Sequence, residues 1–324
     1  MSMPISKLAS IPSVPLGQLP SPIERMDRLR EAIGGGPVLF IKRDDAIPFA
    51  FGGNKVRKLP YVIAEALAQG ADTLITCGGV QSNHARATTA AAVKYGLRPV
   101  LVANGTAPDR ASGNALLDQL MGAEVHYVSS REARTPAMAM LADSLRAAGR
   151  RPYIVPLGAS TPLGALGYVR AVGELIEQGV QPDVIVHACS SGGTTAGLAV
   201  GCTLHGLGTR IIGVSADDPA AGVLQIVRET VAGVGALLEE DGRDLSRRAP
   251  VEIDDTQVGE GYGIPTERSR EAQRLAATKE AIFVDHTYTA KALGAMIAWV
   301  REGRFHRSET VLFWHTGGQV GIFA

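Results

Sequence analysis

The order of predicted strands and helices is the feature that most restricts the fold of this 324-residue chain. Short runs of β-branched and other apolar residues alternate with segments rich in Ala and Leu, and several of these segments end near a glycine. Such alternation predicts parallel β-sheet covered by helices. The predicted strands are 73–76, 99–102, 125–128, 153–155, 184–186, 211–214 and 311–314.

Helices are predicted between these strands. Thr135 is expected to cap the helix at 136–148, with Pro136 at its first position, since both residue types are favoured there. The chain is longer than one core usually spans, so two lobes are expected, a smaller one at 50–150 and a larger one that joins 1–49 to 151–324. The predicted helices are 83–95, 111–121, 136–148, 163–178, a segment from 195 onward, 266–278 and 290–302.

The balance of charges argues for a small ligand. The 32 basic and 32 acidic residues give no basic excess for nucleic acid or an anionic membrane. The three cysteines are odd in number and lack metal-ligand spacing, so we expect no metal and a reduced, cytoplasmic compartment. The first residues have no apolar core of signal-peptide length, and charge or glycine interrupts the longest apolar stretches before they reach spanning length.

The first segment with chemical potential is 52–58. Gly52 and Gly53 allow close approach of the backbone, and Lys55 follows in a chain with only seven lysines. A lysine amine of lowered pKa can form a Schiff base with an aldehyde cofactor, and Arg57 and Lys58 are expected to lower that pKa. Taken alone, a solvated basic turn before a helix explains the segment better.

The second segment follows the predicted strand 73–76. Ser82 occupies a helix N-cap position, which is common for structural reasons alone. The successive polar side chains Gln81, Ser82, Asn83 and His84 exceed what capping needs, and the amides of a helix start suit a carboxylate. Structural and substrate-binding interpretations are about equal here.

The third segment lies between the predicted strand 184–186 and a helix. It lacks the Gly-Lys-Ser/Thr of a P-loop and the spaced glycines of a dinucleotide site, so a monophosphate fits better than a nucleotide. A tight turn of small residues is the structural alternative. A Schiff-base lysine, a carboxylate site and a phosphate site together are what pyridoxal phosphate and an amino acid require. The third segment runs from Ser190 to Gly197, and its candidate phosphate-binding residues are Ser191, Gly192, Gly193, Thr194 and Thr195.

Four ordered motifs now identify a resemblance that runs nearly end to end. The chain resembles the D-cysteine desulfhydrase and 1-aminocyclopropane-1-carboxylate deaminase family. These are fold-type II pyridoxal phosphate enzymes, related to the tryptophan synthase β subunit, which implies two three-layer α/β/α lobes with mostly parallel sheets and a homodimer. The motifs are 40–45, 52–55, 81–84 and 315–318.

The resemblance implies roles for individual residues. Lys55 would be the Schiff-base lysine, Lys58 and the 191–195 loop would contact the phosphate, and Asn83 would bond the ring hydroxyl. Ser82 would bind the substrate carboxylate, or act as a nucleophile in the cyclopropane-opening branch. Tyr262 and Tyr288 match the two active-site tyrosines of the family, against a structural alternative of tyrosines that snorkel at the surface.

One departure from the family pattern bears on the reaction. The cyclopropane deaminases carry Glu at the position of Thr289, facing the pyridine nitrogen, and Thr316 would be a second neutral neighbour of that nitrogen. A hydroxyl stabilises a protonated ring nitrogen less than a carboxylate does, so the cofactor would be a weaker electron sink. A weak sink is enough when a good leaving group departs from the β carbon. Thr289 therefore favours β-elimination over ring opening.

Three family activities stay open. D-cysteine desulfhydrase, which yields pyruvate, ammonium and hydrogen sulfide, is favoured over L-cysteate sulfo-lyase and over cyclopropane deamination. A sulfonate would need extra cations or amides, with His84, His286 and Gln319 as candidates. Outside the family, a binding protein that lost activity would lack the lysine or the tyrosines, and a nicotinamide oxidoreductase would need a dinucleotide fingerprint that is absent from the sequence.

Overall fold

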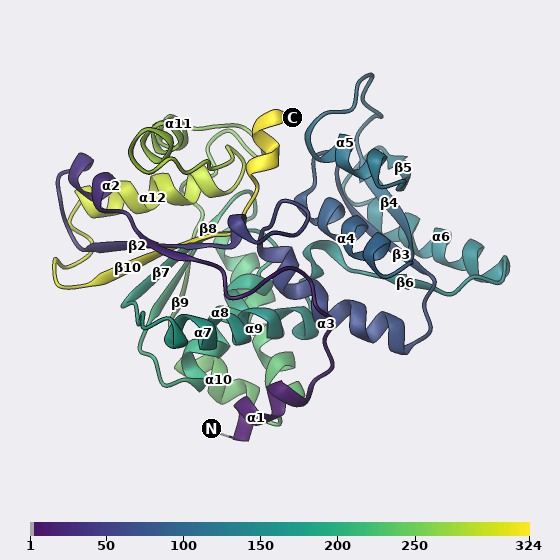
Figure 1. Cartoon of the computed structure of the whole chain (residues 1–324), viewed down its shortest axis with the longest axis horizontal. Helices are drawn as coiled ribbons and strands as arrows, with labels where there is room; N and C mark the ends of the chain where they lie inside the picture. The colour runs from purple at the N-terminus through teal and green to yellow at the C-terminus, as the bar shows by residue number, and fades with distance from the viewer. Residues whose placement is uncertain (1–2) are drawn as a thin grey trace.

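The computed structural model describes residues 3–324 and shows two lobes, each built on one β-sheet (Figure 1). The sheet of the larger lobe has the strand order β1-β2-β10-β7-β8-β9. β1 is antiparallel to β2, and the remaining pairs are parallel. Its strands are β1 (Ile23–Arg25), β2 (Val38–Arg43), β7 (Val184–Cys189), β8 (Arg210–Ser215), β9 (Val251–Asp254) and β10 (Thr310–His315).

The sheet of the smaller lobe is parallel, with the order β5-β4-β3-β6. β6 pairs with β3 from Pro152 to Ile154, so this sheet extends beyond the expected boundary at residue 150. The boundary was placed too early because the chain adds a last short strand beside β3 before it enters the larger lobe. The strands are β3 (Thr73–Gly79), β4 (Arg98–Asn104), β5 (Glu124–Val128) and β6 (Pro152–Ile154).

Helices cover both faces of each sheet, as predicted. In the larger lobe, α2, α11 and α12 pack on one face, and α7, α8 and α9 on the other (Figure 1). In the smaller lobe, α3 and α4 pack on one face and α6 on the other. The helices are α1 (Met3–Ser10), α2 (Asp27–Ala32), α3 (Asn54–Ala68), α4 (Asn83–Lys94), α5 (Gly113–Leu120), α6 (Arg134–Ala147), α7 (Pro162–Glu177), α8 (Gly193–Leu204), α9 (Ala220–Leu238), α10 (Gly242–Arg248), α11 (Glu267–Leu275) and α12 (Thr289–Arg301).

Two predicted helix starts have different outcomes. Ser82 caps α4, where its hydroxyl accepts a hydrogen bond from the Ala85 amide at 3.1 Å, as predicted. Thr135 does not cap α6, because the chain is already helical at Ala133 and α6 begins one residue before Thr135. Pro136 is then the third residue of the helix, which is tolerated because an N–H in the first turn has no helical partner.

α9 is the one helix in residues 3–324 that is long and apolar enough to cross a membrane. Arg228 and Glu229 interrupt it near the middle and are exposed. Val223, Val227 and Val231 on its other face pack in the core of the larger lobe. This packing is that of a core helix.

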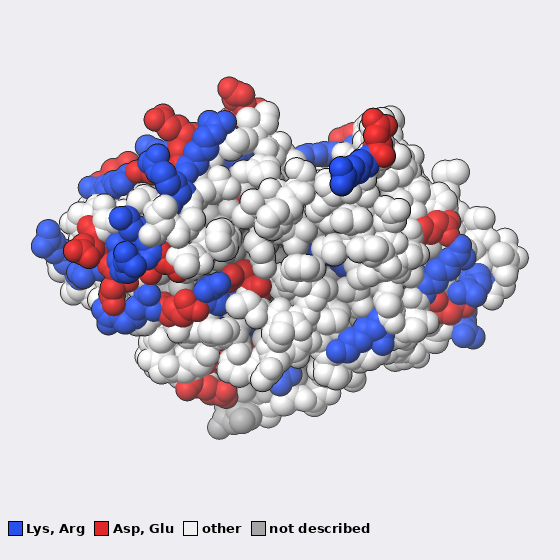
Figure 2. All heavy atoms as spheres, turned by 45° about the horizontal axis from the view of Figure 1, so that its top comes forward, with Lys and Arg blue, Asp and Glu red and all other residues white. Residues whose placement is uncertain are grey.

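Charged side chains of both signs are mixed on the face shown in Figure 2. They are densest over the larger lobe, and the band between the lobes is mostly uncharged. The acidic and basic residues, which are equal in number over the chain, are therefore also mixed with one another on this face.

Candidate active site

A cavity of about 510 Å³ lies between the two lobes. Its lining comes from the start of α3 and from segments that follow the carboxyl ends of parallel strands, where ligands collect in open α/β sheets. Gln81, Thr195 and Thr289 do not line it. The predicted site residues that do are Lys55, Lys58, Ser82, Asn83, His84, Ser191, Gly192, Gly193, Thr194, Tyr262, Tyr288 and Thr316.

Lys55 lies in the first turn of α3 and faces this cavity. The turn before it passes close to Thr316: Gly53 has a φ of 101°, and a side chain there would meet the Thr316 carbonyl oxygen at 3.1 Å. Burial lowers the pKa of Lys55 to about 8, against a small opposing effect of Cys189 and with a further lowering by Arg86. A Schiff-base lysine must react as a neutral amine. The lowered pKa gives Lys55 a larger neutral fraction than an exposed lysine has.

Arg57 does not lower the pKa of Lys55, contrary to the prediction. Its guanidinium forms buried ion pairs with Asp44 at 2.8 Å and with Glu174 at 2.9 Å. Asp44 also accepts hydrogen bonds from Tyr168 and Trp314, both at 2.7 Å. This cluster fastens α3 to β10 and α7, and so fixes the helix start from which Lys55 extends.

The loop before α8 forms a cradle for an anion. A side chain on Gly193 would meet Ser160 Oγ at 2.8 Å and Lys58 Nζ at 3.0 Å, so a hydroxyl and an amine border the space beside the loop. Burial lowers the pKa of Lys58 well below its usual value, and a bound anion would favour its charged form. The amides and dipole at the N-terminus of α8 add to the attraction.

Thr195 takes no part in this cradle, contrary to the prediction. Its buried hydroxyl lies 3.2 Å from Cys189 Sγ and 3.3 Å from His187 Nε2. The residue is two positions beyond the start of α8, so its side chain turns from the loop into the core.

The start of α4 presents Ser82 and Asn83 to the cavity. Ser82 Oγ accepts the Ala85 amide, which leaves the hydroxyl hydrogen free to bond a carboxylate. Asn83 Oδ1 accepts from Arg86 Nη1 at 3.1 Å and from Asn114 Nδ2 at 3.0 Å. The amide nitrogen of Asn83 is the end that stays available to a ligand.

Of the other two polar residues of this segment, Gln81 does not face the cavity as predicted, whereas His84 does line it. The Gln81 side chain accepts the Asn114 amide at 2.9 Å and donates to the Ser112 carbonyl at 3.2 Å, so it ties α5 to the loop instead of facing substrate. His84 lines the cavity, but its Nε2 lies 2.8 Å from the Thr76 hydroxyl, and burial lowers its pKa well below the usual value. His84 is therefore a neutral ring.

The two predicted tyrosines meet at the cavity. The hydroxyls of Tyr262 and Tyr288 are hydrogen-bonded, and the rings pack edge to face with centroids 5.6 Å apart. Burial raises the pKa of both phenols, that of Tyr288 well above its usual value. Both phenols are consequently protonated at neutral pH and can donate a proton.

Two cations that sequence reasoning missed support this pair. Lys291 Nζ donates to the carbonyls of Val258 at 2.7 Å and Gly261 at 2.9 Å, and so holds the loop that carries Tyr262. Arg131, from the smaller lobe, lies 4.8 Å from the Tyr262 ring centroid and forms an ion pair with Asp217 of the larger lobe. A single lysine within the apolar segment 289–300 was the signal for Lys291; no local signal marked Arg131.

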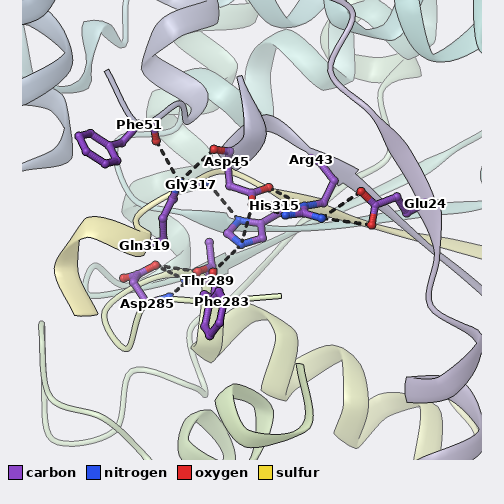
Figure 3. Close-up of polar contacts among 10 residues, drawn as sticks. All are labelled: Glu24, Arg43, Asp45, Phe51, Phe283, Asp285, Thr289, His315, Gly317 and Gln319. Carbon is purple, nitrogen blue, oxygen red and sulfur yellow. Dashed lines mark hydrogen bonds and ion pairs between the residues drawn. The ribbon is translucent and has the colours of Figure 1, made fainter. Parts of the chain in front are cut away.

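Thr289 is not directed at the cavity, contrary to the expectation that it neighbours the ring nitrogen. Its hydroxyl donates to Asp285 Oδ1 at 2.7 Å and accepts the Asp285 amide at 3.0 Å (Figure 3). Thr289 begins α12, and Asp285 binds its backbone amide as well. The Thr289 hydroxyl is thus occupied at the start of α12. Of the two residues expected beside the ring nitrogen, only Thr316, directly after β10, lines the cavity.

The turn that carries Thr316 is fixed by a buried histidine. His315 Nδ1 accepts the Gly317 amide at 3.2 Å, so its proton lies on Nε2, which donates to the Phe283 carbonyl at 3.0 Å (Figure 3). The ring in this orientation ties the Gly317 amide to the Phe283 carbonyl and so closes the turn.

The candidates for sulfonate binding are not supported. Gln319 donates to the backbone carbonyls of Asp45 at 2.9 Å and Phe51 at 3.0 Å (Figure 3), and it does not line the cavity. His286 does not line the cavity, and His84 is neutral. The cations at the cavity edge are instead Arg131 and Arg134.

Pyridoxal phosphate fits the donor set of this cavity. The space beside Gly193, bordered by Ser160 Oγ and Lys58 Nζ, suits a phosphate, and the amine of Lys55 faces the same cavity. Asn83 offers an amide donor and Thr316 a hydroxyl for the ring. A lysine, a phosphate cradle and ring donors within two α/β/α lobes define the class of fold-type II pyridoxal phosphate enzymes.

Comparison with known proteins agrees with this class. The chain belongs to the family of pyridoxal-phosphate dependent enzymes, whose model matches residues 14–317. It is 38% identical over 330 residues to D-cysteine desulfhydrase of Klebsiella pneumoniae (strain 342), with 99% of this chain and 98% of the relative covered. D-cysteine desulfhydrase of Salmonella typhi is also 38% identical, with the same coverage. The resemblance found in the motifs is confirmed.

Solved structures give the same family. The crystal structure of an ACC deaminase homologue superposes with a TM-score of 0.91 at 35% identity, over 100% of this chain and 97% of that one. A pyridoxal 5'-phosphate-dependent aspartate racemase matches with a TM-score of 0.69 at 17% identity, over 93% and 91% of the two chains, which shows the shared fold alone.

Proposed function

We propose that this enzyme is a carbon–sulfur lyase that converts D-cysteine and water into pyruvate, ammonium and hydrogen sulfide. One observation carries the proposal: Lys55, the α4 start with Ser82, and the tyrosine pair line a single cavity. The near-full-length identity to D-cysteine desulfhydrases supports the choice of substrate. A homodimer in the cytoplasm remains part of the proposal.

Each group has a separate task. When bound, pyridoxal phosphate would supply the electron withdrawal from the substrate α carbon that makes loss of the α-proton and of the β substituent possible. Ser82 and the amides at the start of α4 hold the substrate carboxylate. The Lys55 amine, with its pKa near 8, accepts the α-proton. Tyr262 and Tyr288, both protonated, can pass a proton to the departing sulfur.

A second candidate, the elimination of sulfite from L-cysteate, is favoured by the cations at the cavity edge. Arg134 donates to the Arg131 carbonyl at 2.9 Å and weakly to Asn104 Oδ1 at 3.4 Å, and it forms no ion pair among the described residues. A guanidinium with free donors suits a sulfonate. Arg131 is less available because Asp217 already binds it.

A substrate panel should decide between these reactions. With purified holoenzyme, D-cysteine should give pyruvate and sulfide in equal amounts, with a kcat/KM roughly tenfold or more above those of L-cysteine and both cysteate enantiomers. 1-Aminocyclopropane-1-carboxylate should give no 2-oxobutanoate, because ring opening needs a stronger electron sink than Thr316 supports. Sulfite from L-cysteate as the dominant product would favour the second candidate. Turnover of the cyclopropane with cysteine and cysteate inert would overturn both.

A further inference from the structure

Arg86 is a buried cation next to the predicted cofactor site with no ion-pair partner in residues 3–324. It lies on α4, is 2% exposed, and its Nη1 donates to Asn83 Oδ1 at 3.1 Å and to Asn114 Oδ1 at 2.9 Å. Its Nη2 donates to the Gly52 carbonyl at 3.0 Å. The guanidinium thus joins Asn83 to the loop that precedes Lys55.

Little negative charge lies near the buried guanidinium of Arg86 to stabilise its positive charge. Burial lowers its pKa to about 10, whereas the pKa of the ion-paired Arg57 is raised. Asp118 on α5 is the charged group that acts on Arg86 from a neighbouring helix, and Arg86 in turn lowers the pKa of Lys55 on α3. Burial raises the pKa of Asp118 to about 7, so this carboxyl is largely neutral at slightly acidic pH.

Asn114 completes the arrangement around Asn83. It is fully buried at the start of α5, and its Nδ2 donates both to Asn83 Oδ1 at 3.0 Å and to the Gln81 carbonyl at 2.9 Å. Arg86 and Asn114 both donate to the same end of the Asn83 side chain. That end must be the oxygen, because the amide nitrogen cannot accept a hydrogen bond. The nitrogen end is left for the cavity that Asn83 lines.

We propose that Arg86 is a positioning residue for the cofactor ring. Together with Asn114 it holds the Asn83 oxygen, so that the Asn83 nitrogen donates to the ring hydroxyl oxygen, and its buried charge favours the ionised form of that oxygen. This inference rests on the proposed function only in placing the cofactor on Lys55. It does not depend on which amino acid is the substrate.

The test is a spectrophotometric pH titration of the visible band of the holoenzyme without substrate. In Arg86→Gln the midpoint should rise by about one pH unit, because loss of a nearby positive charge disfavours the ionised oxygen and favours a protonated Lys55 nitrogen. The cofactor dissociation constant should rise about tenfold as Asn83 loses one of its two fixed contacts. An unchanged midpoint and dissociation constant in a folded Arg86→Gln protein would overturn the proposal.

Further variants separate positioning from stability. In an Asn83→Ala background, Arg86→Gln should raise the dissociation constant little further, because residues that act through one contact are not additive; full additivity would contradict the proposal.

Arg86→Lys, which keeps the charge, should titrate near the wild-type midpoint but bind cofactor more weakly, and wild-type binding would contradict the positioning role. Arg134→Gln removes a less buried charge that does not contact Asn83, so its midpoint should move less; an equal shift would overturn the route through Asn83. Absence of any visible band in the wild type would instead refute the proposed cofactor site.

Discussion

Replacing Lys55 with alanine should lower kcat by about a thousandfold or more, because the cavity loses both the amine that holds the cofactor and the base that takes the α-proton. Lys58 also lines the cavity, but it is held at 3.1 Å from Ser160 Oγ, beside the phosphate cradle. It is therefore not placed to replace Lys55. Pyruvate formation from D-cysteine measures the effect.

Two matched lysine variants make this result specific. Lys58→Ala should mainly weaken cofactor binding, and excess cofactor should restore much of the rate. Lys94→Ala removes an exposed lysine on α4 and should change neither binding nor rate. Substantial turnover by Lys55→Ala, under conditions in which Lys58→Ala is inactive, would show that the roles of the two lysines are reversed.

Replacing Gly193 with aspartate should strip the cofactor from a folded protein. The new side chain would meet Ser160 Oγ at 2.8 Å, Ser160 Cα at 2.9 Å and Lys58 Nζ at 3.0 Å, so the backbone at Ser160 must shift, and the carboxylate repels a phosphate and competes for Lys58. The cofactor dissociation constant should rise at least about tenfold, as measured by absorbance and by equilibrium dialysis.

Gly208→Asp is the matched control for this substitution. A side chain on Gly208 meets nothing within 4 Å, so the variant adds the same charge without filling the cradle. It should keep its cofactor. Wild-type cofactor occupancy in Gly193→Asp, with the fold verified by circular dichroism, would place the phosphate elsewhere in the cavity.

The parts of the fold that could be predicted from the sequence are those with local causes. The strands β3 and β7 are covered on both faces, so their sequences are apolar runs that a short window detects. β2 was missed because Lys42 and Arg43 interrupt its pattern. Lys42 is nevertheless fully buried, since the Ser21 carbonyl accepts its amine at 2.7 Å, and that partner is remote in sequence.

The site shows the same division between local and long-range causes. The Ser82 cap depends on neighbours three residues away, and the segments at Lys55 and Gly193 carry their own glycines. The direction of the Thr289 hydroxyl depends instead on Asp285, whose backbone and side chain both bind it. The preference for β-elimination is supported by the relatives, while the residue that suggested it lies outside the cavity.

Arg86 could not have been assigned from the sequence for a related reason. An arginine one turn into a helix usually lies in solvent, and its burial here depends on Asn114 and Gly52, which lie on α5 and in the loop before α3. Only the packing of three separate segments gives this side chain a role.

The most direct test of the central claim is to identify the residue that carries the cofactor. Purified holoenzyme should show a visible absorbance band that borohydride removes, and the reduction should fix a pyridoxyl group to the protein. Proteolysis and mass spectrometry should then locate that group on Lys55, in the peptide that contains Gly52 and Gly53. A pyridoxyl group on Lys58, on any other lysine, or on none would contradict the assignment of Lys55 and of this cavity.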